Sequence, residues 1–141
     1  KRVVVDELAR GGEGRRMVVR VVSFGFKYGL PIDADLVFDL RYLPNPHFVP
    51  ELRPKTGREP EVSSYVLERP ATQELLGDLM QFFEHTLPRY EKEGKAYLTV
   101  AIGCTGGEHR SVAVSEELGK RLKGDWDVVV HHRDADRSRP R

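Results

Sequence analysis

The chain has 141 residues, enough for one domain with its own buried core. Its 39% hydrophobic and 32% charged residues favour a globular domain, and no apolar run approaches the ~18 residues of a membrane span. A net charge of +1 excludes a surface that is basic throughout, so polyanion binding would depend on local clusters. The single cysteine, Cys104, excludes an internal disulfide and a multi-cysteine zinc site. It is typical of a reducing compartment, so we expect a cytoplasmic protein without a metal or other cofactor.

The first third of the chain predicts an arm and two strands. Residues 1–16 are polar and rich in glycine, so we expect a flexible arm or linker. Because the chain starts without Met, we also expect an upstream part. β-branched residues at 17–23 and the apolar run at 36–40 predict strands, and Gly and Pro at 24–31 predict a loop.

Prolines recur through residues 42–60 and exclude a regular helix or an inner strand there. Apolar and aromatic residues stand between the prolines, which favours an ordered, packed loop over a disordered linker. These anchors are Tyr42, Leu43, His47, Phe48 and Leu52.

The remaining elements alternate between helix and strand. Apolar residues at helical spacing predict a helix from Thr72, its N-cap, to Glu93, and Pro88 is expected to kink it or split off its last turn. Strands are predicted at 97–102 and 126–131, and a helix at 110–123. This order predicts the α/β class: a mixed, partly parallel sheet flanked by helices. The single domain should span 17–133, followed by a basic tail at 134–141.

A glycine-rich loop joins the third strand to the second helix. Glycines at 103, 106 and 107 can adopt positive φ and turn their amides inward, and the helix behind them adds free N–H groups. Polar side chains in the loop suit an anion, the arginine as a planar fork. We therefore predict a phosphate site formed by Thr105, Gly106, Gly107, His109, Arg110 and Ser111. Alternatively, the glycines form an ordinary turn and Arg110 is solvated.

Two enzyme classes carry a glycine-containing phosphate loop between a strand and a helix. No G-x-x-x-x-G-K-[ST] motif occurs, which excludes a nucleotide-hydrolysing P-loop. Cys104, Arg110 and Ser111 resemble the loop of cysteine-dependent phosphatases, in which a thiolate attacks phosphorus and an arginine clamps the oxygens. However, Gly103 replaces the usual His, and the Trp-Pro-Asp acid loop is missing. We expect no catalysis and keep the phosphatase as the alternative; Cys104 is otherwise a small buried residue.

A second polar cluster, Asp39, Arg41, Asn45 and His47, follows the second strand. Ligands of open α/β sheets bind beyond the carboxyl ends of strands, so this cluster and the loop should share one edge. Carboxylate, amide and imidazole groups suit the hydroxyl or amino groups of a sugar. The other interpretation is structural, with Asp39 paired to Arg41 and His47 packed in the loop.

Basic residues at Lys27 and in the tail, at Arg137, Arg139 and Arg141, are candidates for RNA binding. They suit the phosphates of RNA, but surface and tail charges are usually just solvated.

Four blocks in order resemble the C-terminal domain of the RNase adapter protein RapZ family: residues 23–27, 29–35, 38–47 and 103–112. The resemblance runs from about Val18 to Arg133. Proteins of that family join an N-terminal, nucleotide-binding, kinase-like domain, absent here, to this domain.

The resemblance implies binding of glucosamine-6-phosphate, a cell-envelope precursor, and self-association. In enterobacterial members it also implies binding of a small RNA and its presentation to an endoribonuclease. It places phosphate binding at residues 105–111, sugar binding at the Asp39 cluster and RNA contact at Lys27. The tail departs from the denser basic run of enterobacterial members. We therefore expect a regulatory binding domain for post-transcriptional control.

Overall fold

The computed structural model describes residues 16–137 and contains one four-stranded sheet. Expectations for residues 1–15 and 138–141 lie outside the described part. The elements in chain order are β1 (Val18–Gly25), η1 (Phe26–Tyr28), β2 (Leu36–Asp39), η2 (Pro46–Phe48), α2 (Pro60–Leu67), α3 (Pro70–Lys92), β3 (Tyr97–Cys104), α4 (Arg110–Leu122) and β4 (Asp127–His132).

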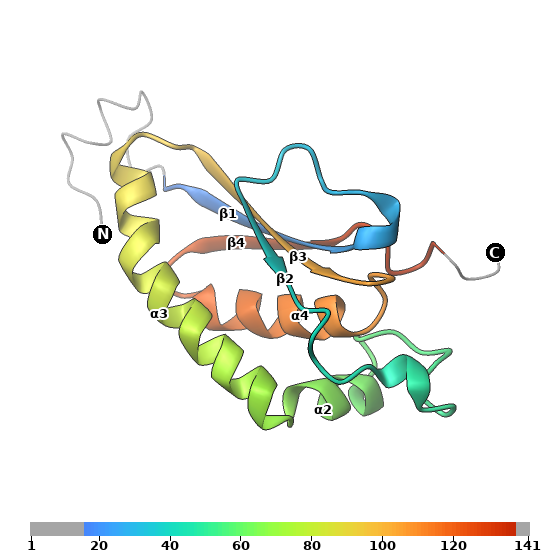
Figure 1. The fold of residues 1–141 in the computed structure, drawn as a ribbon. Helices are drawn as coiled ribbons and strands as arrows, with labels where there is room; N and C mark the ends of the chain where they lie inside the picture. The colour runs from blue at the N-terminus through green and yellow to red at the C-terminus, as the bar shows by residue number, and fades with distance from the viewer. Residues whose placement is uncertain (1–15, 138–141) are drawn as a thin grey trace.

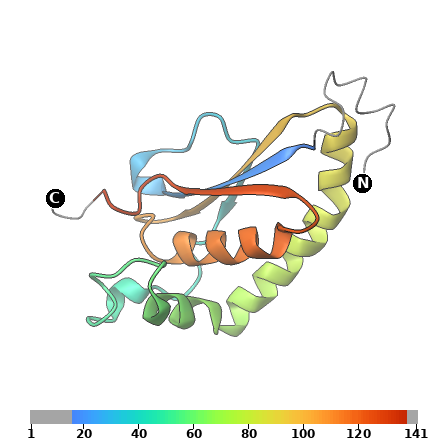
Figure 2. The ribbon, with the colours of Figure 1, turned by 180° about the vertical axis from the view of Figure 1, so that it is seen from behind.

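The sheet has the order β2-β3-β1-β4, and its three pairings are all parallel. The predicted α/β class is confirmed, with a sheet that is parallel rather than mixed. The connections from β2 to β3 and from β3 to β4 step in the same direction across the sheet. Right-handed crossovers then place their helices on one face. Figures 1 and 2 show α2, α3 and α4 on that face, while the helix-poor connection from β1 to β2 lies on the other.

The core lies between the sheet and these helices. Alternate residues of β1 and β3 point toward it, because side chains alternate across a strand. α3 contributes the apolar stripe predicted from its spacing. The core side chains from these elements include Val19, Val21, Leu98, Val100, Ile102, Leu76, Leu79, Phe83 and Leu87, each at most 4% exposed. Amphipathic helices and alternating strands therefore share one apolar layer.

Three details differ from the sequence-based expectations. β1 and β3 each continue two residues further, because Gly25 and Cys104 pair in register. The N-cap of α3 is Arg69, with Pro70 in the first turn, so the prediction of Thr72 as the cap was wrong. α3 also continues through Pro88 to Lys92, so the last turn is not split off.

The proline-rich segment is ordered, as predicted, but not all of its anchors are buried. Leu43 is 3% exposed, and Leu52 packs against the core. Tyr42 and Phe48 are instead 65% and 76% exposed. The segment ends in α2, which the sequence analysis missed because it begins at Pro60.

Candidate anion-binding site

A cavity of about 680 Å³ lies between the loop after β3 and the proline-rich segment. The loop and the start of α4 contribute Cys104, Thr105, Gly106, Glu108, His109 and Arg110 to its lining. The other side is formed by Asn45, His47, Phe48, Arg53 and Pro54, and Lys27 adds a third segment. Residues separated by more than fifty positions thus meet at the carboxyl edge of the sheet.

The loop is held by very close backbone packing against the end of β1. Gly107 has a φ of +77°, and a Cβ there would lie 2.6 Å from the amide nitrogen of Gly25. A Cβ on Gly25 would lie 2.4 Å from the carbonyl carbon of Gly106. Of the three loop glycines expected to allow positive φ, only Gly107 uses it. Gly103 is required for space instead, since a Cβ there would meet the ring of Phe24 at 2.4 Å.

Arg110 is buried, 3% exposed, and its guanidinium joins the start of α4 to the segment after β2. Nη1 donates to the carbonyl oxygens of Arg41 and Leu43, both at 2.9 Å. Nη2 reaches Thr105 Oγ1 at 3.4 Å, and Nε is buried without a partner in the described structure. Arg110 is therefore neither solvated nor a free phosphate fork, because it ties the segment after β2 to α4.

Cys104 and Ser111 are both buried and bonded to each other. The Cys104 thiol lies 3.1 Å from Ser111 Oγ, and the Ser111 amide donates to Sγ at 3.4 Å. This places the sulfur at the N-terminus of α4, as in the phosphatase alternative. The guanidinium of Arg110, however, is engaged with main-chain carbonyls. Ser111 does not line the cavity, although Cys104, to which it is bonded, does.

Two histidines lie across the cavity from each other. The rings of His47 and His109 have centroids 6.5 Å apart, and His109 Nε2 donates to the carbonyl of Arg53 at 3.2 Å. His47 is placed by Asn45, whose Oδ1 accepts from the His47 amide at 3.0 Å. Arg53 in turn donates from Nε to the His47 carbonyl at 2.6 Å. These bonds close the proline-rich segment over the loop.

Asp39 and Arg41 form an exposed pair that does not line the cavity. Arg41 Nη2 donates to Asp39 Oδ2 at 2.7 Å, and its guanidinium lies 3.9 Å from the ring centroid of Phe26. The hydrogen bond from Arg41 holds the pKa of Asp39 below its ordinary value of 3.8. Of the predicted sugar-binding cluster, the cavity thus brings together Asn45 and His47, while the other two form the ion pair considered as their alternative.

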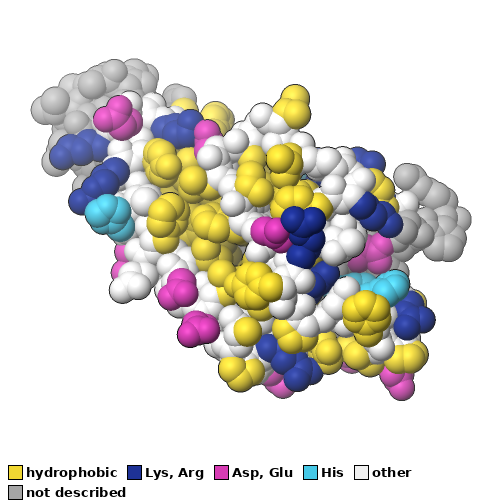
Figure 3. Space-filling view, viewed as in Figure 1, with side chains coloured by type: hydrophobic (Ala, Val, Ile, Leu, Met, Phe, Trp, Pro, Cys, Tyr) yellow, Lys and Arg dark blue, Asp and Glu magenta, His cyan; other side chains and the backbone are white. Residues whose placement is uncertain are grey.

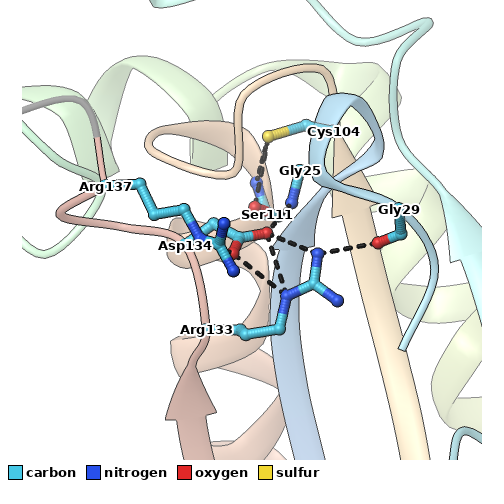
Figure 4. Close-up of polar contacts among 7 residues, drawn as sticks. All are labelled: Gly25, Gly29, Cys104, Ser111, Arg133, Asp134 and Arg137. Atoms are coloured by element: carbon cyan, nitrogen blue, oxygen red, sulfur yellow. Dashed lines mark hydrogen bonds and ion pairs between the residues drawn. The ribbon is translucent and has the colours of Figure 1, made fainter. Parts of the chain in front are cut away.

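A buried carboxylate joins the segment after β4 to this edge (Figure 4). Asp134 is 0% exposed and accepts from the Gly25 amide at 2.8 Å. Arg133 and Arg137 both bond it, at 2.8 Å. Burial alone would raise the pKa of Asp134, but the arginines and the Gly25 amide together hold it below 3.8. The predicted tail is therefore packed onto the domain as far as Arg137.

The basic candidates lie near one another where the structure describes them. Lys27 Nζ is 5.2 Å from the ring centroid of Tyr28, and the guanidinium of Arg137 is 4.6 Å from the same ring. Arg139 and Arg141 lie outside the described residues. Figure 3 shows basic and histidine side chains interspersed with apolar ones on this face.

Other kinds of site find little support in residues 16–137. No three His, Cys, Asp or Glu side chains within that range are grouped closely enough to hold a metal ion. None of the helices described there has the length and apolar content needed to cross a membrane.

Comparison with known proteins identifies the family of the chain. The model of the RapZ C-terminal domain matches residues 17–136. The chain belongs to this family. It is 53% identical over 129 residues to a nucleotide-binding protein of Brevibacillus brevis, covering 92% of this chain and 44% of that relative. It is 56% identical over 119 residues to one of Bacillus cytotoxicus, covering 84% of this chain and 41% of the relative.

The chain thus spans less than half the length of these RapZ-family relatives. Membership of the family indicates a regulatory or adapter role.

Sequence reasoning missed part of the cavity lining. Phe48, Arg53, Pro54 and Glu108 line it, and Lys27 lies there although it was assigned to RNA. No motif in the proline-rich segment marks Arg53, because its position depends on how that segment turns.

Proposed function

We propose that this domain binds a phosphorylated amino sugar, glucosamine-6-phosphate, in the cavity between the loop and the proline-rich segment. The observation that supports this most is the meeting of the two predicted blocks in one hollow. Thr105, Gly106, His109 and Arg110 supply the phosphate side, and Asn45 and His47 supply the sugar side. Donors and acceptors on facing walls suit a ligand with an anion at one end and hydroxyl and amino groups at the other.

The test is calorimetric titration with glucosamine-6-phosphate and with glucosamine. We expect the phosphorylated sugar to bind at least ~10-fold more tightly, because a hydrogen bond to a charged group contributes about 1.5–3 kcal/mol. Equal affinity for the two sugars would remove phosphate recognition from the proposal.

Thr105→Val is the first variant to compare, since it removes a hydroxyl from the cavity with little change in shape. We expect it to weaken the phosphorylated sugar selectively. Thr86→Val is a matched control, because the Thr86 hydroxyl only donates to Phe82 within α3, at 2.9 Å.

Arg110→Ala should abolish binding of the phosphorylated sugar and should also destabilise the fold. Its loss leaves the carbonyls of Arg41 and Leu43 unpaired, which costs roughly 1–3 kcal/mol for each buried group. A drop in melting temperature, measured by circular dichroism, checks this second effect. An Arg110→Ala protein with wild-type stability would show that the clamp has no energetic role.

The proposal predicts no turnover. Release of phosphate from an aryl phosphate, lost in Cys104→Ser, would establish the phosphatase alternative instead. The observation that favours this alternative is the bond between Cys104 and Ser111, which places the thiol at the start of α4.

We further propose that the domain contacts RNA through its basic residues as part of an RNase adapter. Two cations, Lys27 and Arg137, approach the single ring of Tyr28, an arrangement that suits a nucleotide phosphate beside a stacked base. Affinity for a structured RNA should fall steeply with salt, and charge removal at Arg137, Arg139 and Arg141 should lower that slope. Binding that does not respond to salt would contradict this part.

A further inference from the structure

Lys27 holds a fixed main-chain position beside the loop. It lies in η1, directly after β1, and its amide donates to the carbonyl of Thr105 at 3.2 Å. Its side chain is exposed and lines the cavity. No carboxylate within residues 16–137 pairs with it, and its ammonium lies near the ring of Tyr28. It therefore brings a positive charge to the cavity that is not neutralised by the described part of the chain.

The two arginines of the cavity are less available. Arg110 donates from Nη1 to two main-chain carbonyls and from Nη2 to Thr105 Oγ1. Arg53 donates from Nε to the His47 carbonyl at 2.6 Å. Both guanidinium groups thus hold main chain in place, so each can offer its remaining N–H groups to a ligand only from a fixed position. A lysine is different, because its flexible stem lets the ammonium approach a phosphate dianion without breaking any of these bonds.

From this geometry we propose that Lys27 is the mobile cation of the phosphate site. Its ammonium binds the phosphate oxygens over Thr105 and Gly106 and selects the phosphorylated sugar over the neutral one. This role rests on the proposed function of the cavity. It gives Lys27 a part in recognising the small ligand that is separate from any contact with RNA.

The experiment compares wild type, Lys27→Met, Lys27→Arg and the control Lys120→Met, which removes an exposed lysine near the end of α4. Each is titrated calorimetrically with glucosamine-6-phosphate, glucosamine and inorganic phosphate. We expect Lys27→Met to weaken both phosphate compounds ~10-fold or more and to leave glucosamine unchanged. Lys27→Arg should retain most of the affinity, and Lys120→Met should resemble wild type.

A pH series separates direct contact from a structural effect. The second pKa of a phosphomonoester is about 6, so wild-type affinity should rise between pH 5.5 and 7.5 as the dianion forms. The rise should be smaller in Lys27→Met, because this variant lacks the ammonium group that interacts with the second negative charge of the phosphate.

The outcomes distinguish this inference from the proposed function. If Lys27→Met binds like wild type while Thr105→Val is weakened, the site stands and the role of Lys27 is refuted. If Lys27→Met weakens all ligands equally, Lys27 acts on the loop structure, which also refutes the proposal. If wild type does not prefer the phosphorylated sugar, the proposed function itself fails.

Discussion

Gly106 and Gly107 adjoin in the loop but face different surroundings. Gly107 has positive φ and contacts the backbone of β1, whereas a Cβ on Gly106 would meet nothing within 4 Å. Gly107→Ala should lower the free energy of unfolding by more than the roughly 1–2 kcal/mol of a left-handed residue, because the methyl group also overlaps Gly25. Urea denaturation measures this effect.

Gly106→Ala is the matched control for stability and a probe of the cavity. It should change the free energy of unfolding by less than about 1 kcal/mol, since the position has open space. Because Gly106 lines the cavity, the added methyl group should still lower the affinity for the phosphorylated sugar. Equal loss of stability in both variants would show that the loop does not depend on its packing against β1.

His132 makes stability depend on pH near neutrality. Its Nε2 lies 2.6 Å from Glu116 Oε2 and its Nδ1 lies 2.6 Å from Ser23 Oγ. A carboxylate only accepts, so Nε2 donates to it and the neutral ring accepts from the serine hydroxyl. Burial lowers the pKa of His132 below 6.5, although Glu116 opposes the shift. These two bonds connect β4 to α4 and to β1. Ser23 is 0% exposed, so its hydroxyl is not accessible as a nucleophile.

A group with a lowered pKa binds protons more readily when unfolded, so its stability contribution is present above pH 6.5 and lost below it. The free energy of unfolding should therefore fall as the pH drops from about 7.5 to 5. This fall should be smaller in His132→Gln and unchanged in His85→Gln, which alters an exposed side chain of α3. A wild-type curve that is flat in this range, or one that rises on acidification, would contradict the assignment.

At the scale of elements, Asp134 fixes the segment after β4 to the end of β1. Asp134→Asn removes the negative charge between Arg133 and Arg137 and should cost on the order of 3 kcal/mol, as breaking a buried ion pair does. Because Gly25 contacts the loop, ligand affinity should fall as well. Chemical denaturation and calorimetry on the same samples measure both effects. Asp136→Asn is the neighbouring control. Asp136 is exposed and its ion pair with Arg58 is long, at 3.8 Å, so this substitution should change the free energy of unfolding little.

The sequence predicts those elements that have a clear periodicity. The stripe on α3 and the apolar runs of β1 and β3 are visible because each faces a single core. α2 was missed because a proline that breaks a helix interior is favoured in its first turn. The cap of α3 was misplaced for the same reason, since Pro70 starts the helix before Thr72.

The candidate site was predictable where its residues are adjacent in sequence. The loop from Thr105 to Arg110 forms one wall because strand, glycines and helix follow directly. The opposite wall depends on turns between prolines, so Arg53 and Phe48 gave no signal. Asp39 had the right chemistry and the right sheet edge, yet its side chain pairs with Arg41 instead of facing the cavity.

For the molecule as a whole, the single core predicts cooperative unfolding. Trp126, the only tryptophan, packs against the core, so its fluorescence reports on tertiary structure. Fluorescence and far-ultraviolet circular dichroism should give coincident transitions. A ligand at 100 times its Kd should add about 2.7 kcal/mol, or roughly 10 °C in melting temperature. Two separate transitions would contradict a single cooperative unit.

The position of β1 inside the sheet has a consequence for how the chain matures. Of the four strands of this sheet β1 is made first, yet its neighbours are β3 and β4, the two that are made last. Its backbone N–H and C=O groups therefore have no strand partners until α2 and α3 have been synthesised. Such long-range parallel pairing closes slowly and leaves unpaired strands exposed in the meantime. Nascent chains halted before β4 should therefore lack a closed sheet and depend on chaperones.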